Sequence, residues 1–194
     1  MKVELKHYTP LQVADDAIGK CWDKPSTGEC NIKRMHRVAN QFKHASTIEH
    51  ISYNFDIDGI SRALLQELAR HRHTSLSVKS TRYTLKELKN CADEDIQSFN
   101  IHIDDRINII NGLQLMSIRD MLQGGASNDR VKYLLPEAYK TSLVWTINAR
   151  SLQNFLSLRT DKAALWEIRD LAKEIYSKLP IEHMYLFEEF VKDN

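Results

Sequence analysis

Short alternating segments in the first third of the chain predict β-strands. Apolar and polar residues alternate in KVELKHY at positions 2–8 and again at positions 50–57, the pattern of a strand with one buried face. The Asp-Gly pair at positions 58–59 is typical of a turn. Ser61 suits a helix N-cap and leucines follow it at helical spacing, so we expect a helix that runs into Arg70.

Later segments predict helices more often than strands. Apolar side chains recur three and four residues apart over positions 96–116, and the Gly-Gly pair at 124–125 ends that predicted helix. Residues 142–147, SLVWTI, fit either a short strand or the first turns of a helix, and their β-branched and aromatic content leaves both open. Residues 148–159 favour a helix, and an amphipathic helix over residues 165–179 stops before a proline.

Together these elements predict an α+β fold in which helix predominates. We expect the strands early and a helix-rich C-terminal half. Glycine and proline are scarce, at six and four residues, and are nowhere clustered, so no linker or repeat divides the chain. We therefore expect a single domain over residues 1–194, a length that can bury one good core.

The overall composition changes this picture little. The chain is 42% hydrophobic and 27% charged, as in ordinary globular proteins, and its formal net charge is +1. A general nucleic-acid binder shows a clear cationic excess, so we expect no nucleic-acid partner. A near-neutral net charge is still compatible with a local site that binds an anion.

Cysteine usage and the N-terminal sequence favour a cytoplasmic location. The three cysteines, Cys21, Cys30 and Cys91, are odd in number and irregular in spacing, which fits neither a disulfide framework nor a zinc motif. Reduced thiols are therefore expected. The N-terminus lacks an apolar run of signal-peptide length, and no window reaches the roughly 20 apolar residues of a membrane span.

One stretch, RHRHTSLSVKSTRY at positions 70–83, concentrates cations and hydroxyls. Its charged side chains include no acid: Arg70, Arg72, Lys79 and Arg82. Arginine presents a planar fork of donors that suits phosphate and carboxylate, and serine and threonine hydroxyls add further contacts. If the stretch is extended, Ser80 and Arg82 share one face and can touch one ligand. The residues thus indicate a site for a phosphorylated small molecule.

Two other interpretations of this stretch stay open on the residues alone. It can be a solvated basic strand, in which cations discourage aggregation at a sheet edge. A metal site at His71 and His73 is disfavoured, because the flanking arginines repel a cation and no acids stand at ligand spacing. We expect no metal site.

The same stretch carries a spacing found in a known enzyme family. Arg70-His71-Arg72 is followed by seven residues and then Ser80. Further stretches follow the family's order: HASTIEH at 44–50, DRVKYLLP at 129–136, NARSLQNFLSLR at 148–159 and WEI at 166–168. The chain thereby resembles the flavin-dependent thymidylate synthases over residues 44–169, and NARSLQNFLSLR is the most specific match.

The resemblance implies a fold and a reaction. The fold is of α/β type, with a central, mostly antiparallel sheet flanked by helices. The resemblance also implies a homotetramer that binds FAD where subunits meet. Its active sites are shared between chains. The implied reaction converts dUMP to dTMP; methylenetetrahydrofolate supplies the carbon and NADPH reduces the flavin.

The resemblance also implies roles for individual positions. Positions that match flavin contacts are Ser46, Arg70, His71, Arg72, Asn148, Arg150 and Asn154. Positions that match dUMP contacts are Glu67, Arg70, Ser80, Thr81, Arg82, Lys132 and Arg159. Of these, residues 80–82 correspond to the loop that holds the dUMP phosphate. His44 is implied to lie near the flavin, where folate is expected.

Arg159 has the role with the most chemical consequence. The resemblance places it against the uracil ring, where it stabilises negative charge as ring nitrogen 3 ionises. Uracil must become electron-rich at carbon 5 to attack a methylene carbon, and a fixed cation in a site shielded from water favours the charged form. Arginine stays protonated, so Arg159 is expected to act electrostatically rather than as a base.

Several positions depart from the family pattern. Glu67 stands where glutamine is common, and an acid is unfavourable near a phosphate unless it faces a sugar hydroxyl or a cation. Asp129 and Lys132 replace a common glutamate and arginine, and lysine lacks the bidentate fork. Val78 stands where an acid or amide is common. We place Asp129 and Val78 at the margin of the predicted site.

These departures motivate a competing hypothesis. The chain can be a nucleotide- or RNA-binding module that keeps the fold without the catalysis, and such binding to nucleic acid weakens steeply with salt. A purely structural helical protein is a further alternative. Ser80 is not favoured as a nucleophile because no neighbouring base is evident. The cysteines are expected to be bystanders. His36, His102 and His183 lie outside the motifs and are expected to be surface or satisfied core histidines.

Overall fold

A four-stranded antiparallel sheet forms the centre of the molecule. The computed structural model describes residues 1–24 and 30–192. The strands are β1 (Lys2–Tyr8), β2 (Ser52–Ser61), β3 (Thr74–Val78) and β4 (Lys140–Asn148). They lie in the order β1-β2-β4-β3, and each neighbouring pair is antiparallel. The expected antiparallel sheet is confirmed, as is the α+β class.

Helices connect and cover these strands. The α-helices are α1 (Leu11–Cys21), α2 (Ile32–His36), α3 (Arg62–Leu68), α4 (Thr81–Thr84), α5 (Lys86–Lys89), α6 (Asp105–Gln123), α7 (Asn128–Val131), α8 (Ala149–Arg159) and α9 (Trp166–Ser177). A π-helical turn spans Arg37–Gln41, and 3₁₀ helices span Ala45–His50, Asp93–Phe99, Lys132–Leu134, Ile181–Leu186 and Glu188–Phe190. No helix in the described part of the chain is long and apolar enough to cross a membrane.

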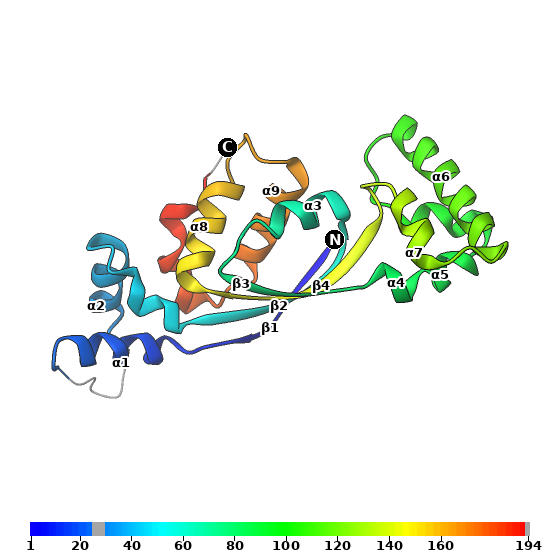
Figure 1. Ribbon diagram of the computed structural model, residues 1–194. Coiled ribbons are helices and arrows are strands. Elements are labelled where there is room, and N and C mark those ends of the chain that lie inside the picture. Colours follow the sequence, from blue (N-terminus) through cyan, green and yellow to red (C-terminus); the bar gives the residue numbers. More distant parts are fainter. Residues whose placement is uncertain (25–29, 193–194) are drawn as a thin grey trace.

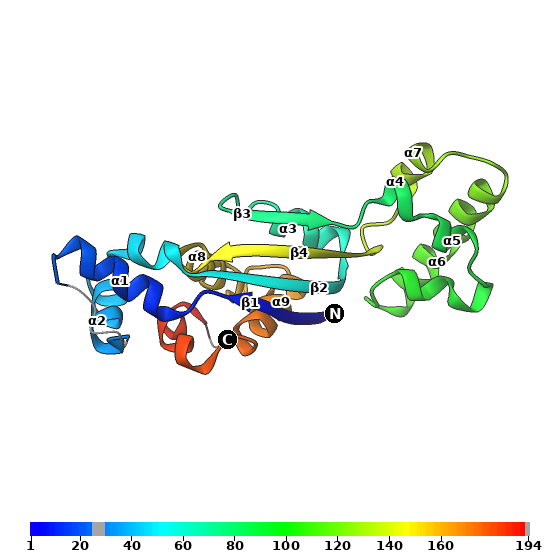
Figure 2. The same cartoon turned by 90° about the horizontal axis from the view of Figure 1, so that it is seen from below.

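The helices sit at three places around the sheet (Figure 1). Helices α3, α8 and α9 cover one face of the strands, while α1 and α2 lie at one end and α4 to α7 at the other. Figure 2 shows the strands side by side with α3, α8 and α9 behind them. The alternation in β2 explains this layering, because Tyr53, Phe55 and Ile57 are fully buried and the residues between them are partly exposed.

Two separate apolar clusters stabilise the chain. The larger lies between the sheet and its helices, where Phe55, Trp145 and Phe155 meet with ring centroids 5.0–6.2 Å apart. The smaller lies among α4 to α7, which we call the helical lobe, and includes Leu85, Leu88, Ile96, Leu115, Ile118 and Leu122. The lobe is inserted between β3 and β4, so those two strands carry it at one end of the sheet.

Several local predictions are confirmed. Segment 2–8 is a strand, and the Ser61 hydroxyl caps α3 by accepting a hydrogen bond from the Leu64 amide at 2.9 Å. The glycine at 124 caps the end of α6, and Gly125 follows with φ +92°. The segment left open at 142–147 is strand β4.

Other local predictions are wrong. The Asp-Gly pair forms no chain-reversing turn, because β2 continues to Ser61 through a bulge at Gly59, where φ is +73°. The helix predicted over 96–116 is divided: a 3₁₀ helix ends at Phe99, and α6 begins after Asp104, whose side chain caps it by accepting from the Ile107 amide. The strands are not confined to the early part of the chain, since β4 follows the helical lobe.

Candidate active site

The Arg-His-Arg segment forms the tight connection between α3 and β3. The His71 amide donates to the Leu68 carbonyl at 3.0 Å, which closes the end of α3. The Thr74 hydroxyl donates to the His71 carbonyl at 2.8 Å, which ties the start of β3 back to the same loop. Arg70 and Arg72 stay exposed on either side of a largely covered His71. The loop thus presents two guanidinium groups while it anchors the imidazole.

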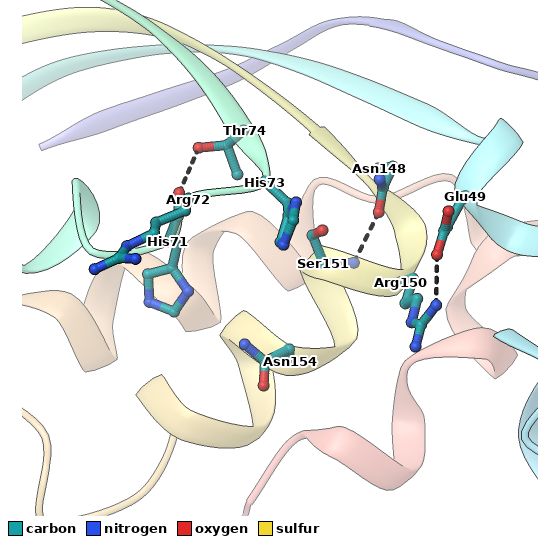
Figure 3. Close-up of a pocket in the computed structure, with 9 residues that line it drawn as sticks. All are labelled: Glu49, His71, Arg72, His73, Thr74, Asn148, Arg150, Ser151 and Asn154. Atoms are coloured by element: carbon teal, nitrogen blue, oxygen red, sulfur yellow. Dashed lines mark hydrogen bonds and ion pairs between the residues drawn. The ribbon is translucent and has the colours of Figure 1, made fainter. Parts of the chain in front are cut away.

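A second element, the junction of β4 and α8, faces this loop (Figure 3). Asn148 caps α8 by accepting a hydrogen bond from the Ser151 amide at 2.8 Å, and the Ala149 amide donates to the Ile51 carbonyl at 2.8 Å. The first turn of α8 is therefore fixed. Arg150 and Asn154 are one helical turn apart and both border the hollow between α8 and the loop.

Two adjoining hollows flank the loop. One, of about 470 Å³, lies between the loop, the start of α8 and Glu49. The other, of about 710 Å³, extends along α8 to Arg159 and reaches Asp161 and Lys192. They share His71, Arg72, His73 and Asn154. The loop and α8 therefore bring together five residues that the sequence assigned to flavin binding: Arg70, His71, Arg72, Arg150 and Asn154, with Asn148 at the helix start.

Arg159, at the last turn of α8, is held from two directions. Its Nε donates to Nε2 of His71 at 3.0 Å. Its Nη1 donates to Oε2 of Glu67 at 2.7 Å, and its Nη2 donates to the Glu67 main-chain carbonyl at 3.2 Å. The Arg159 side chain is 14% exposed and that of Glu67 is 33% exposed. The guanidinium is thus fixed at the edge of the larger hollow.

His71 is neutral in this arrangement. Burial, including edge-on packing against Phe155 at 5.0 Å, lowers its pKa to about 4; the charges of Arg159 and Arg70 lower it further, and Glu67 opposes them. The neutral ring accepts from Arg159 at Nε2, so its proton sits on Nδ1. The imidazole is therefore an acceptor for the arginine rather than a second cation beside it.

The predicted phosphate residues lie at the other end of β3. The strand ends at Val78, Ser80 precedes α4, and Arg82 is within α4, so the expectation that Ser80 and Arg82 share one strand face is wrong. Ser80 is six positions after Thr74, a span of roughly 20 Å in extended chain. Within one chain, residues 80–82 therefore do not converge with Arg159.

Asp129 and Lys132 belong to the same distant group. Nε of Arg82 donates to Oδ1 of Asp129 at 2.8 Å, and the Asn128 side chain donates to the Arg82 carbonyl at 2.8 Å. Lys132 lies over the ring of Tyr133, with Nζ 5.5 Å from its centre. Arg82 and Asp129 are both more than half exposed, so α4 and α7 form a second, open polar surface.

Ser46 and His44 lie near the start of β2 and are not among the residues that line the two hollows. Ser46 is in the 3₁₀ helix Ala45–His50 and is exposed, and His44 precedes that helix with its ring 6.4 Å from that of Phe42. The predicted flavin and folate roles of these two residues stay predictions.

Several residues that border the hollows were not predicted as site residues. Glu49 pairs with Arg150 at 2.5 Å, and its place in HASTIEH was a signal that it belonged to the site. His73 and Thr74 continue the Arg-His-Arg loop. Asp161 and Lys192 pair at 2.7 Å at the far side of the larger hollow, and they carry no motif that would have singled them out.

The fold and these hollows define an α+β protein with a cationic site between the Arg-His-Arg loop and α8. The family model described as thymidylate synthase complementing protein matches residues 5–181, so the chain belongs to that family. Its relatives include flavin-dependent thymidylate synthases, and the chain is an enzyme of this kind.

The similarity extends over nearly the whole chain. The Campylobacter jejuni (strain RM1221) flavin-dependent thymidylate synthase is 50% identical over 199 residues, which cover 97% of this chain and 96% of the relative. The Helicobacter pylori (strain 26695) enzyme is 48% identical over 207 residues, 99% of this chain and 100% of its own. The crystal structure of thymidylate synthase X from Helicobacter pylori with FAD and dUMP has a TM-score of 0.93, with 46% identity and complete coverage of both chains.

Proposed function

We propose that the enzyme converts dUMP to dTMP with FAD as cofactor, methylenetetrahydrofolate as carbon donor and NADPH as reductant. The observation that carries this proposal is the fixed guanidinium of Arg159 at the edge of a hollow lined by further cations. The similar Helicobacter pylori structure holds FAD and dUMP, which supports the same two ligands here.

The smaller hollow has the donors that a flavin dinucleotide needs. Arg72 and Arg150 come from two different elements and can pair with a pyrophosphate, and Asn148, Ser151 and Asn154 add hydrogen-bonding groups. The volumes of the two adjoining hollows also suit a ligand of that size. When bound, FAD supplies the hydride chemistry that no side chain can perform.

Arg159 is proposed to activate the uracil ring. Arginine has five N–H donors, and His71 and Glu67 occupy three of those of Arg159, which leaves one on each terminal nitrogen. A fixed, largely covered cation stabilises negative charge on the ring more strongly than a mobile, solvated one. The role of Arg159 is therefore electrostatic: it binds the ring and favours its electron-rich form.

The dUMP phosphate is proposed to be bound by a second copy of the chain. Residues 80–82 stand roughly 20 Å along β3 from the Arg-His-Arg loop, so a nucleotide against Arg159 requires these groups from elsewhere. Helix α6 exposes Ile109, Ile110 and Leu113 by about 60% each, an apolar face that a partner subunit would cover. Both observations support the homotetramer with shared sites. A cytoplasmic location stays a prediction.

The proposed function is tested by product formation. Purified enzyme is incubated with dUMP, methylenetetrahydrofolate and NADPH, and dTMP is measured by chromatography. Omitting any one component, or removing FAD, is expected to abolish product. Product that persists without flavin or without folate would overturn the proposal, and binding of dUMP or RNA without product would favour the binding-module hypothesis.

A further inference from the structure

We propose that Glu67 is a positioning residue, which together with His71 holds the guanidinium of Arg159 in its working orientation. Glu67 was assigned to dUMP by resemblance, yet its carboxylate faces Arg159. The inference rests on the proposed function, because it concerns how Arg159 is held for that reaction.

Glu67 binds Arg159 through two acceptors, its carboxylate and its main-chain carbonyl. The side chain accepts from Nη1 at 2.7 Å, and the main-chain carbonyl, in the last turn of α3, accepts from Nη2 at 3.2 Å. The same carbonyl also accepts from the Arg70 amide at 3.4 Å, and the two lone pairs of a carbonyl oxygen allow it to take both donors. His71 accepts from Nε at 3.0 Å. Three contacts from three nitrogens fix both the position and the plane of the guanidinium.

The charge of Glu67 argues against a direct role at the nucleotide. A carboxylate repels a phosphate and a pyrimidine that gains negative charge, so it would weaken the binding of dUMP that it touched. Paired with Arg159, the same carboxylate lies beside a cation, where an acid is favourable. The departure from the family's common glutamine therefore has a structural explanation: glutamate gives a charge-assisted hydrogen bond to the arginine.

His71 completes the arrangement because it is neutral. Its ring packs edge-on against Phe155, and its carbonyl accepts from the Thr74 hydroxyl, so the acceptor nitrogen is held in place. Burial lowers the pKa of His71 to about 4, which keeps Nε2 available as an acceptor at neutral pH. Glu67 and His71 thus act on Arg159 from α3 and from the loop after it.

Three substitutions distinguish an effect on the position of Arg159 from an effect of the negative charge at residue 67. Glu67→Asp keeps the charge but shortens the side chain, Glu67→Gln keeps the length and one acceptor oxygen but removes the charge, and Glu67→Leu removes both. Because a misplacement of about 1 Å can lower a rate about 100-fold, we expect kcat to fall roughly 10- to 100-fold in the Asp and Leu variants. Glu67→Gln should recover most of this loss, and the KM for dUMP should stay within about threefold throughout.

The control is Glu87→Asp, the same shortening at an exposed acid on α5 that pairs with Lys79 at 2.7 Å. Exposed pairs contribute little, so kcat should change less than about twofold. Bound flavin is measured by absorbance in every variant, and thermal unfolding confirms that each is folded. If Glu67→Leu does not fold, the Asp and Gln variants still decide between position and charge.

Three results would overturn the inference. A tenfold rise in the KM for dUMP with unchanged kcat would make Glu67 a direct ligand. Equal losses in the Gln and Leu variants would assign the effect to charge. A crystal structure of Glu67→Asp in which Arg159 keeps its contact with His71 would refute positioning whether or not the wild type makes dTMP; absence of dTMP with the wild type would instead refute the proposed function.

Discussion

The buried carboxylate of Glu167 determines how firmly α3 is anchored, and its removal gives a quantitative test of this structure. Glu167 is 3% exposed and accepts from the Ser61 amide at 2.8 Å and from the Ser61 hydroxyl. The same hydroxyl accepts from the Leu64 amide, so α9, the end of β2 and the start of α3 meet at one carboxylate.

The expected magnitude follows from these contacts. A hydrogen bond to a charged group contributes roughly 1.5–3 kcal/mol, and Glu167 accepts two. Removing a buried charge offsets part of that loss, so we expect Glu167→Leu to lower the free energy of unfolding by about 3 kcal/mol. Glu167→Gln keeps one acceptor oxygen and should lower it by about 1–2 kcal/mol.

Urea unfolding followed by circular dichroism measures the free energy of unfolding of each variant. The comparison requires that this free energy depends on urea concentration with the same slope in every variant. Glu174→Gln is the control, because Glu174 lies on the same helix, is exposed and pairs with Lys178 only at 3.9 Å. It should change stability by less than about 0.5 kcal/mol. If Glu167→Leu lowers stability by less than about 1 kcal/mol, the carboxylate does not anchor α3 as described.

Three further outcomes are expected. Arg159→Ala should lower kcat for dTMP formation about 100- to 1000-fold with flavin retained, and near-normal turnover would contradict its electrostatic role. The pKa of His71 is about 4 in the folded chain and 6.5 is its ordinary value, so the unfolded chain binds more protons between these two pH values. The free energy of unfolding should therefore fall as pH drops from 6.5 to 4. His71→Asn should flatten that dependence in urea titrations. Co-expressed Arg82→Ala and Arg159→Ala chains should regain roughly a quarter of wild-type activity if each site uses both residues from different subunits, and no recovery would place both in one chain.

The sequence correctly predicted the elements that depend mainly on neighbouring residues. The alternation in β1 and β2 and the cap at Ser61 depend on neighbouring residues alone, and these elements are as expected. Segment 142–147 stayed open because its residues suit both a strand and a helix, and only pairing with β2 and β3 decides it. The bulge at Gly59 also depends on pairing with β4, so the Asp-Gly pair alone was misleading.

Contacts between residues distant in sequence also limited how much of the site could be predicted. Resemblance identified Arg159 and the Arg-His-Arg loop, and the structure brings them together. The contact between Arg159 and Glu67 joins positions 92 apart, so spacing gave no sign that the unusual acid has a cation as its partner. The sequence also suggested one continuous phosphate site over positions 70–83, whereas β3 separates its two ends.

The insertion of the helical lobe between β3 and β4 has a consequence for how the chain folds. The contacts of the smaller apolar cluster join residues within positions 85–139, so closing them costs less chain entropy than pairing β2 with β4, and we expect them to form first. Once the lobe is compact, the end of β3 and the start of β4 are already close, as the bond from the Lys79 amide to the Ser142 carbonyl at 2.9 Å indicates. The lobe thereby shortens the effective loop that β4 must close to reach β3. Pulsed hydrogen exchange during refolding should protect amides of α6 before those of β4, and the reverse order would show that the sheet organises the lobe.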